Sequence, residues 1–161
     1  MPIHFEPRRL DHADPQAMIA RVQAYYAELY GSGDDGPLPV EDLAPPAGEL
    51  LVAYDGSEPV AMIGWRRREV AGLEGPTVEL KRMFVVDGRR GQGLGRLALA
   101  HVEDRLRAEG IATVVLLTGS LQVAATGLYA SQGYLPLPDG VDRSWDPYVN
   151  DPLSVQLYKR L

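Results

Sequence analysis

The stretch RRGQGLGR at residues 89–96 decides how the chain is interpreted, because it places three glycines and three arginines within eight residues. It follows MFVVD, which is typical of a strand, and precedes LALAHVEDRLRAEG, which has helical periodicity. Glycine allows close approach of a backbone to a ligand, and N–H groups at a helix start attract anions. The stretch therefore predicts a tight turn with solvated arginines, a mononucleotide loop, or a site for another phosphate.

Two common phosphate motifs do not fit this loop. Gly88 and Gly93 have the spacing of a P-loop, but Leu94 and Gly95 stand where Lys and Ser or Thr belong. The dinucleotide fingerprint also fails, because Arg96 replaces its third glycine. Arginine forks suit a pyrophosphate, so a site for another phosphate is favoured over the nucleotide loops.

The strand before the loop, residues 78–86, contains an irregular pattern. Strict alternation would mix charged and apolar side chains on both faces. A bulge near Lys81 and Arg82 would let Leu80, Met83 and Val85 share a buried side, and it would leave backbone groups available to a ligand. The alternative is a plain strand whose charged ends reach solvent.

The rest of the chain predicts alternating helices and strands. A helix is expected from an N-cap at Asp14 to Gly31, followed by a loop over residues 31–49 that contains a short helix at 40–43. Further strands are expected at residues 50–54, 59–67, 111–117 and 153–158, and further helices at 95–109 and from about 121 to Gly133. The pattern predicts an α/β fold with a mixed sheet.

Composition limits the function. A chain of 161 residues predicts a single domain, 1–161, and the net charge of −6 argues against nucleic-acid binding. The absence of cysteine excludes disulfides and thiolate chemistry, and His4, His12 and His101 lack the spacing of a metal site. No apolar stretch is long enough for a signal peptide or a membrane span, so we expect a cytoplasmic protein without membrane contact.

Two motifs resemble those of the GCN5-related N-acetyltransferases, the GNAT family. The segment ELKRMFVVDGRRGQGLGRLAL at 79–99 contains Arg90-x-x-Gly93-x-Gly95, similar to the family's acetyl-coenzyme A motif. The segment VVLLTGSLQVAATGLYASQGYLPL at 114–137 is similar to its next motif. The resemblance covers residues 48–161 well. It implies a mostly antiparallel mixed sheet flanked by helices, and a bacterial N-acetyltransferase that uses acetyl-CoA.

The resemblance also implies the residues that hold acetyl-CoA. The loop amides would bind the pyrophosphate, which implicates Arg90, Gly91, Gln92, Gly93, Leu94, Gly95 and Arg96. The backbone of Met83, Phe84 and Val85 would bind the pantetheine arm. Gln122 stands where many relatives carry an asparagine that contacts coenzyme A, and it is one methylene longer.

Acetyl transfer to an amine needs a base and an acid. An amine with a pKa of ~10.4 arrives protonated, and a departing thiolate with a pKa of ~8.5 benefits from receiving a proton. By resemblance, Tyr129 would protonate the sulfur and Glu79 would be the base, often through water. The alternatives are a tyrosine packed on the sheet and a solvated carboxylate at a strand end.

The acceptor is less defined than the donor. The resemblance places its pocket near Tyr25, Tyr26, Tyr30, the acidic loop Asp34 to Glu41, Arg66 to Arg68, and Arg82. Both signs of charge are present, so we expect only that the acceptor is a small-molecule or peptide amine. Since the sequence contains no Gly-x-Ser-x-Gly elbow and no metal spacing, we expect direct attack in a ternary complex. A catalytically silent CoA-binding sensor and a phosphate binder are the alternatives, and the oligomeric state is left open, a homodimer included.

Overall fold

The computed structural model of the chain describes residues 2–31 and 38–161. It divides into two compact units, each described by itself below. The first unit comprises Met1–Arg66 and Lys81–Leu99, and the second comprises Arg67–Leu80 and Ala100–Leu161. The organisation of residues 1–161 as a single domain stays a prediction.

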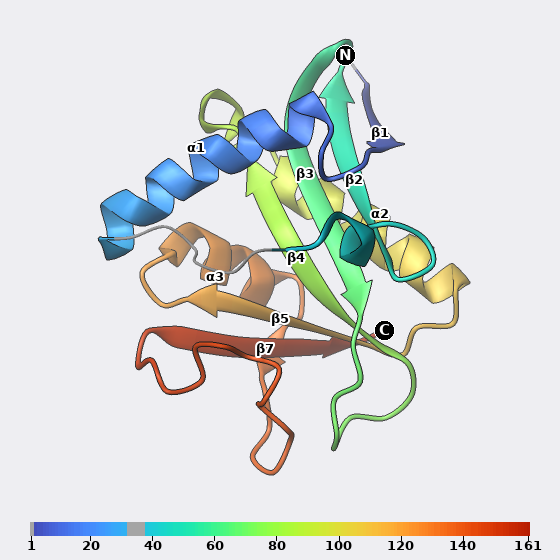
Figure 1. Cartoon of the computed structure of the whole chain (residues 1–161), viewed down its shortest axis with the longest axis vertical. Coiled ribbons are helices and arrows are strands. Elements are labelled where there is room, and N and C mark those ends of the chain that lie inside the picture. Colours follow the sequence, from blue (N-terminus) through green and yellow to red (C-terminus); the bar gives the residue numbers. More distant parts are fainter. Residues whose placement is uncertain (1, 32–37) are drawn as a thin grey trace. The chain divides into compact units, whose positions relative to one another are not determined.

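Seven strands form one hydrogen-bonded sheet in the order β1-β2-β3-β4-β5-β7-β6 (Figure 1). The strands are β1 Ile3–Pro7, β2 Gly48–Asp55, β3 Glu58–Arg67, β4 Thr77–Val85, β5 Thr113–Gly119, β6 Leu135–Pro136 and β7 Ser154–Arg160. The helices are α1 Ala13–Tyr30, α2 Leu94–Ala108 and α3 Val123–Ser131, with short 3-10 turns η1 Val40–Leu43 and η2 Asp87–Arg89. The mixed, mostly antiparallel α/β fold is thereby confirmed.

The first unit is built on the antiparallel strands β1, β2 and β3. Buried apolar residues of these strands form one core with α1, where Met18 and Val22 are buried. The resulting core also contains Val52, Met62 and Phe84, so it joins α1 to β2, β3 and the last part of β4. This packing holds β4 in place up to the point where the glycine loop begins.

The start of α1 differs from the prediction. The N-cap is His12, whose extended backbone lets Nδ1 accept a hydrogen bond from the Asp14 N–H at 3.1 Å. Asp14 lies inside the first turn, and its carboxylate accepts a 2.6 Å hydrogen bond from the Tyr54 hydroxyl. An imidazole therefore replaces the expected carboxylate cap, because the tertiary contact with β2 engages Asp14. The predicted end of the helix at Gly31 is confirmed.

The second unit is built around β5. This strand pairs in parallel with residues 77–79 of β4 and antiparallel with β7. Val114, Val115 and Leu116 are fully buried, as their unbroken apolar run predicts. Val115 packs with Val70, Leu137 and Trp145 in a small core. The loops that carry these three residues are thus fixed to the centre of the sheet.

The segment between β6 and β7 is ordered by one buried carboxylate. Asp146 accepts hydrogen bonds from the Tyr148 N–H at 2.7 Å, from the Ser154 hydroxyl at 2.8 Å and from the Gln156 amide. The Trp145 indole N–H donates to the Asp142 carbonyl at 2.9 Å. These bonds fix Asp142, which lines a cavity considered below.

Candidate functional site

The glycine loop leads from η2 into the start of α2, in the first unit. Gly91 and Gly93 both have φ of 79°, a left-handed conformation that other residues adopt only with strain. A Cβ at either position would meet no atom within 4 Å among the described residues. The glycines are therefore required by backbone conformation, and the space above them is open. The Gly93 carbonyl accepts the Leu97 N–H at 3.0 Å, so the N–H groups of the first turn before Leu97 have no acceptor within the helix.

The arginines of the loop have different roles. Arg89 pairs with Asp55, and this hydrogen bond lowers the pKa of the Asp55 carboxyl. Arg90 donates to the Val85 carbonyl at 3.3 Å and lies 3.2 Å from an Asp87 oxygen. Arg96 is exposed on the first turn of α2. Arg89 therefore ties the loop to the β2–β3 hairpin, which leaves Arg90 and Arg96 as the cations that face solvent.

The irregularity predicted in β4 is confirmed at Arg82, which has φ of +59°. It is the one non-glycine residue with positive φ among residues 2–31 and 38–161, a conformation that costs roughly 1–2 kcal/mol. The predicted burial beyond it is wrong: Phe84 is buried, whereas Met83 and Val85 are half-buried. Beyond Arg82, Phe84 belongs to the core of the first unit, and the half-buried Val85 packs against the same core.

Tyr129 lies near the end of α3, in the second unit, and is buried. Its ring meets the Tyr134 ring edge to face with 5.7 Å between centroids. The Tyr134 hydroxyl donates to Glu103 at 2.9 Å, and Lys159 donates to the other Glu103 oxygen at 2.7 Å. Burial and the Glu103 carboxylate raise the pKa of Tyr134, so its hydroxyl stays protonated. The Tyr129 ring therefore packs on Tyr134, whose hydroxyl belongs to a polar cluster with Glu103 and Lys159.

Glu79 lies on the first part of β4 and is 1% exposed. Its Oε1 accepts two hydrogen bonds from Arg68, from Nε at 3.2 Å and from Nη2 at 2.9 Å. The ion pair compensates the charge of a carboxylate removed from water. The alternative of a solvated carboxylate at a strand end therefore does not hold for this residue. Sequence reasoning missed the pairing, since no local spacing links Arg68 to Glu79.

Gln122 is the N-cap residue of α3 and is half-buried. Its backbone carbonyl accepts hydrogen bonds from the Thr126 N–H at 3.0 Å and from the Thr126 hydroxyl at 3.2 Å. Its side chain makes no capping hydrogen bond to the helix. The main chain of Gln122 therefore starts the helix, and its amide is not used for that purpose.

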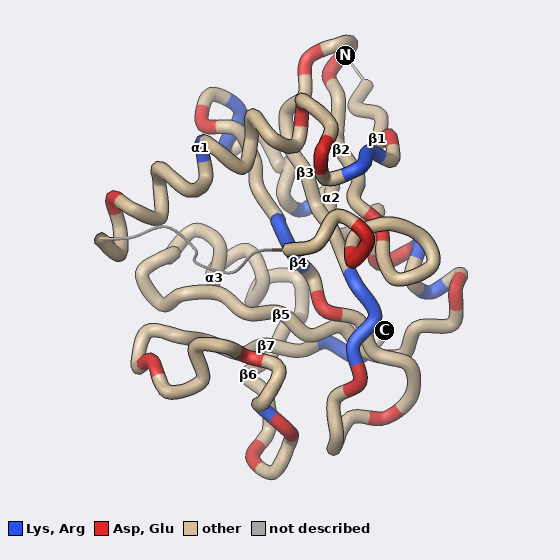
Figure 2. Tube along the Cα trace, in the orientation of Figure 1, with Lys and Arg blue, Asp and Glu red and all other residues tan. Residues whose placement is uncertain are grey.

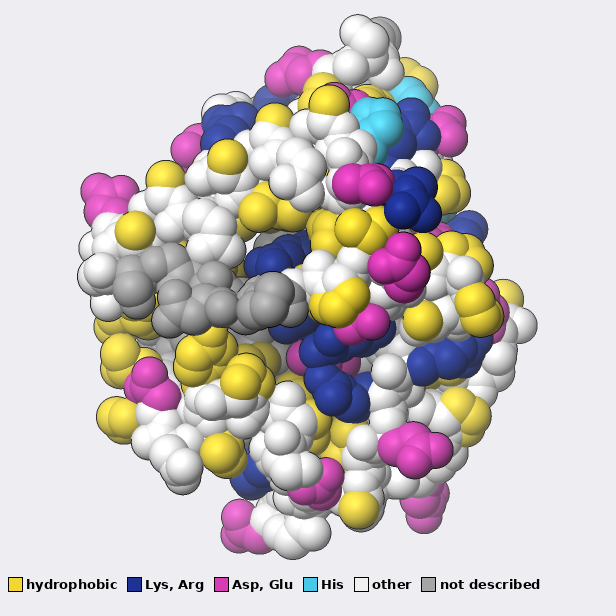
Figure 3. Space-filling model, viewed as in Figure 1, with side chains coloured by type: hydrophobic (Ala, Val, Ile, Leu, Met, Phe, Trp, Pro, Cys, Tyr) yellow, Lys and Arg dark blue, Asp and Glu magenta, His cyan; other side chains and the backbone are white. Residues whose placement is uncertain are grey.

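The residues expected around the acceptor are divided between the units. In the first unit Tyr25 lies under the Arg90 guanidinium at 5.3 Å, and Arg66 pairs with Asp42 at 2.7 Å. In the second unit Arg67 lies 3.2 Å from Glu109. Residues 34–37 of the acidic loop lie outside the described residues. Figure 2 shows the basic run that ends β3, and Figure 3 shows basic side chains at the surface there.

The predicted site residues are divided between the two units. The first unit holds Met83, Phe84 and Val85 together with the loop from Arg90 to Arg96. The second holds Glu79, Gln122 and Tyr129. Within the described ranges, no group of three or more His, Asp or Glu side chains is placed to hold a metal ion. Nor does any helix in those ranges have the length and apolar character needed to cross a membrane.

Comparisons with known proteins agree with this arrangement. Residues 16–134 match the model of the acetyltransferase (GNAT) family. An IAA acetyltransferase of Azospirillum brasilense is 33% identical over 145 residues, which are 89% of this chain and 88% of the relative.

Solved structures share the fold. A Klebsiella pneumoniae protein assigned as an acyl-CoA N-acyltransferase has a TM-score of 0.76 and 29% identity, with 99% of this chain and 97% of that chain covered. A GNAT-family acetyltransferase of Staphylococcus aureus has a TM-score of 0.77 at 21% identity, with 99% of each chain covered. The glycine loop, the irregular β4 and the family match lead to one conclusion: the chain belongs to the GNAT family of acetyltransferases, which use acetyl-CoA as the acetyl donor.

Proposed function

We propose that this acetyltransferase transfers an acetyl group to a primary amine of a small molecule or peptide, by direct attack in a ternary complex. The observation that carries the proposal is the glycine loop, where Gly91 and Gly93 leave open space before the first turn of α2. Such a loop supports binding of a pyrophosphate, and the bound donor supplies an acetyl thioester. The absence of cysteine supports direct attack without an acyl-cysteine.

The donor would be held by two sets of groups in the first unit. Backbone N–H groups from Arg90 to Arg96 would bind the phosphates, helped by the charges of Arg90 and Arg96. Backbone groups of Met83, Phe84 and Val85, which follow the irregular Arg82, would bind the pantetheine arm. Gln122 would add a contact from its side-chain amide.

Two residues of the second unit would move the protons. Tyr129 would give its hydroxyl proton to the leaving sulfur, and its ring is supported by Tyr134 for this role. Glu79 would accept the proton of the amine. Because Glu79 is 1% exposed, that proton would reach it through bound water and not by direct contact.

A second candidate acceptor comes from the Azospirillum brasilense relative. Its name specifies IAA, and the identity of 33% over most of both chains makes the same acceptor a candidate here. A CoA-binding protein without catalysis is the alternative class. The presence of both Tyr129 and Glu79 favours an enzyme over that alternative.

The first experiment is a calorimetric titration of the protein with acetyl-CoA, and with ATP and NAD as comparison ligands. We expect acetyl-CoA alone to bind at micromolar concentration. A thiol reagent would then report CoA release with a panel of amines and IAA, without background because the chain has no cysteine. Binding without release on any acceptor would favour the silent CoA-binding protein, and preference for ATP would reject the proposed donor site.

A further inference from the structure

A cavity within the second unit is lined by Arg68, the ion-pair partner of the candidate base Glu79. Its volume is about 740 Å³, within the range of ligand pockets. It is formed by the segment between β3 and β4 together with one residue of the segment between β6 and β7. The lining residues are Arg67, Arg68, Glu69, Val70, Ala71, Leu73, Gly75, Pro76, Thr77 and Asp142. The Asp142 N–H donates to the Ala71 carbonyl at 2.9 Å, which fixes the two segments to each other.

Arg68 is the group in this cavity best placed to bind an anion. Its Nε and Nη2 donate to Glu79 Oε1. Because Glu79 is buried, these two hydrogen bonds fix the position of the guanidinium. These two contacts leave Nη1 available, in the part of the chain that the structure describes. The side chain is 29% exposed. An anchored guanidinium with a donor to spare is a common way to bind a carboxylate.

The other walls of the cavity restrict the ligand further. Val70, Leu73 and Pro76 provide apolar surface, which suits a hydrocarbon or aromatic body. Glu69 and Asp142 provide negative charge, and hydrogen bonds from Ser144 lower the pKa of Asp142, so it is ionised at neutral pH. These carboxylates suit an ammonium group. The cavity thus combines a cationic group, an apolar wall and anionic groups.

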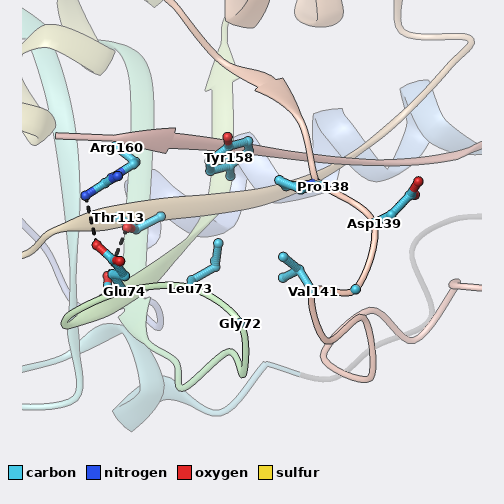
Figure 4. A pocket seen from close by; sticks show the side chains of 10 residues that line it. Gly72, Leu73, Glu74, Thr113, Pro138, Asp139, Val141, Tyr158 and Arg160 are labelled. Atoms are coloured by element: carbon cyan, nitrogen blue, oxygen red, sulfur yellow. Dashed lines mark hydrogen bonds and ion pairs between the residues drawn. The ribbon is translucent and has the colours of Figure 1, made fainter.

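A neighbouring cavity in the same unit lacks these properties and offers a control (Figure 4). It has a volume of about 360 Å³. Its one cation, Arg160, is 69% exposed and lies 3.1 Å from a Glu74 oxygen at one end of the cavity. No buried carboxylate anchors Arg160, because Glu74 is itself exposed. An exposed pair of this kind gives little binding energy or selectivity.

We propose that the larger cavity binds the acceptor through its carboxylate at Arg68, so that the acceptor is a small amino acid-like molecule that carries an amine, a carboxylate and an apolar body. This proposal rests on the proposed function, because it treats the cavity lined by Arg68 as the acceptor site. It assigns Arg68 as the residue that selects the acceptor, with Glu79 as its anchor.

The test compares two probes that differ only by a carboxylate, phenylalanine and phenethylamine. Binding is measured by NMR from the shifts of backbone amides of Leu73 and Thr77. We expect phenylalanine to bind about tenfold more tightly than phenethylamine. Arg68→Lys keeps a positive charge beside Glu79 but removes the planar fork, and it should abolish most of the preference. Arg160→Lys is the matched control and should retain it.

Equal binding of the two probes, no binding of phenylalanine, or a preference that survives in Arg68→Lys would each overturn the proposal. The same probes are then used in the thiol-release assay with acetyl-CoA. Carboxylate preference in binding with no release on any amine would reject the proposed function. Release without carboxylate preference would support the proposed function and reject Arg68 as the selecting residue.

Discussion

Two carboxylates of the second unit, Glu79 and Glu103, are buried to the same degree but have different surroundings. Glu103 is 4% exposed and is surrounded by Lys159 at 2.7 Å, Tyr134 at 2.9 Å and Arg107 at 3.5 Å. Glu79 is 1% exposed, and the Arg68 that pairs with it lines a cavity. Glu103 belongs to a cluster between α2 and β7, whereas the Glu79 pair reaches a cavity.

The difference teaches that burial of a charge does not by itself indicate function. Both carboxylates need cations to offset the loss of hydration. The informative property is what else the cation contacts, besides the carboxylate with which it pairs. Lys159 also lies 5.5 Å from the Tyr134 ring, so its second contact is again structural. Arg68 faces space that a ligand can fill. We therefore expect changes at Glu103 to alter stability and changes at Glu79 to alter activity.

The largest effect is expected from a substitution that disrupts the Glu103 cluster. Lys159→Met removes the ammonium but keeps most of the side-chain volume, which leaves a buried carboxylate poorly compensated. We expect a loss of about 3 kcal/mol in the free energy of unfolding. The measurement is urea unfolding followed by circular dichroism. The matched control is Arg160→Met at the next position, whose partner Glu74 is exposed, and it should cost less than about 1 kcal/mol. Equal losses in the two variants would contradict a structural role for the cluster.

The second prediction separates Tyr129 from the cluster that supports it. Tyr129→Phe keeps the ring that packs on Tyr134 and removes only the hydroxyl. We expect CoA release to slow by ~10²-fold or more, with acetyl-CoA affinity and unfolding free energy little changed. Stopped-flow detection of thiol measures the rate, and calorimetry measures the affinity. A rate equal to that of the wild type would remove Tyr129 from the mechanism.

Much of the fold follows from the sequence because its signals are local. The apolar run of β5 and the glycine that ends α1 predict their elements within a few residues. Two strands were not predicted, β1 and β6. The first is five residues long and ends at Pro7, and the second has only two residues. Both form because a neighbouring strand supplies their hydrogen bonds.

The candidate site was predictable where backbone conformation determines it. The glycines of the loop indicated a backbone that a ligand can approach closely, and mixed charges in β4 indicated the irregularity found at Arg82. The pairing of Arg68 with Glu79 was not predictable, because it depends on how the segment between β3 and β4 folds back. The side of β4 that is buried after Arg82 was predicted wrongly for a similar reason. The pattern locates a bulge but does not give the turn of the strand beyond it.

The third prediction tests Glu79 through the pH dependence of activity. Glu79→Gln retains an oxygen that can accept from Arg68, so the fold should survive. If Glu79 accepts the proton of the amine, activity should fall most at low pH, where more of the acceptor is protonated. We expect a loss of about tenfold or more near pH 6 and a smaller loss near pH 9. The measurement is the pH profile of kcat/KM by thiol release. A profile parallel to that of the wild type would discard Glu79 as the base.

The smallest effect concerns a third carboxylate, Asp55, which is closer to solvent than Glu79 or Glu103 and pairs with Arg89 of the glycine loop. The hydrogen bond from Arg89 lowers the pKa of Asp55 below its usual value. A lowered pKa in the folded state gives stability that is present above the unfolded pKa of about 3.9 and is lost as the pH falls through the folded value. Asp55→Asn should therefore be slightly less stable than the wild type at pH 7.

Urea unfolding at pH 7 and at pH 3 measures this difference. Glu58→Gln is the control, because Glu58 lies 3.5 Å from the same arginine and is 60% exposed, so it should change stability less. The difference between the wild type and Asp55→Asn should shrink toward pH 3, since below the unfolded pKa of about 3.9 protonation of the unfolded chain progressively removes the stability that the ionised Asp55 contributes. A difference that stays constant with pH would mean that packing, and not charge, fixes Arg89. In that case side-chain packing, and not the Asp55–Arg89 ion pair, would hold the loop to the β2–β3 hairpin. The comparison of carboxylates by their surroundings would then not apply to Asp55.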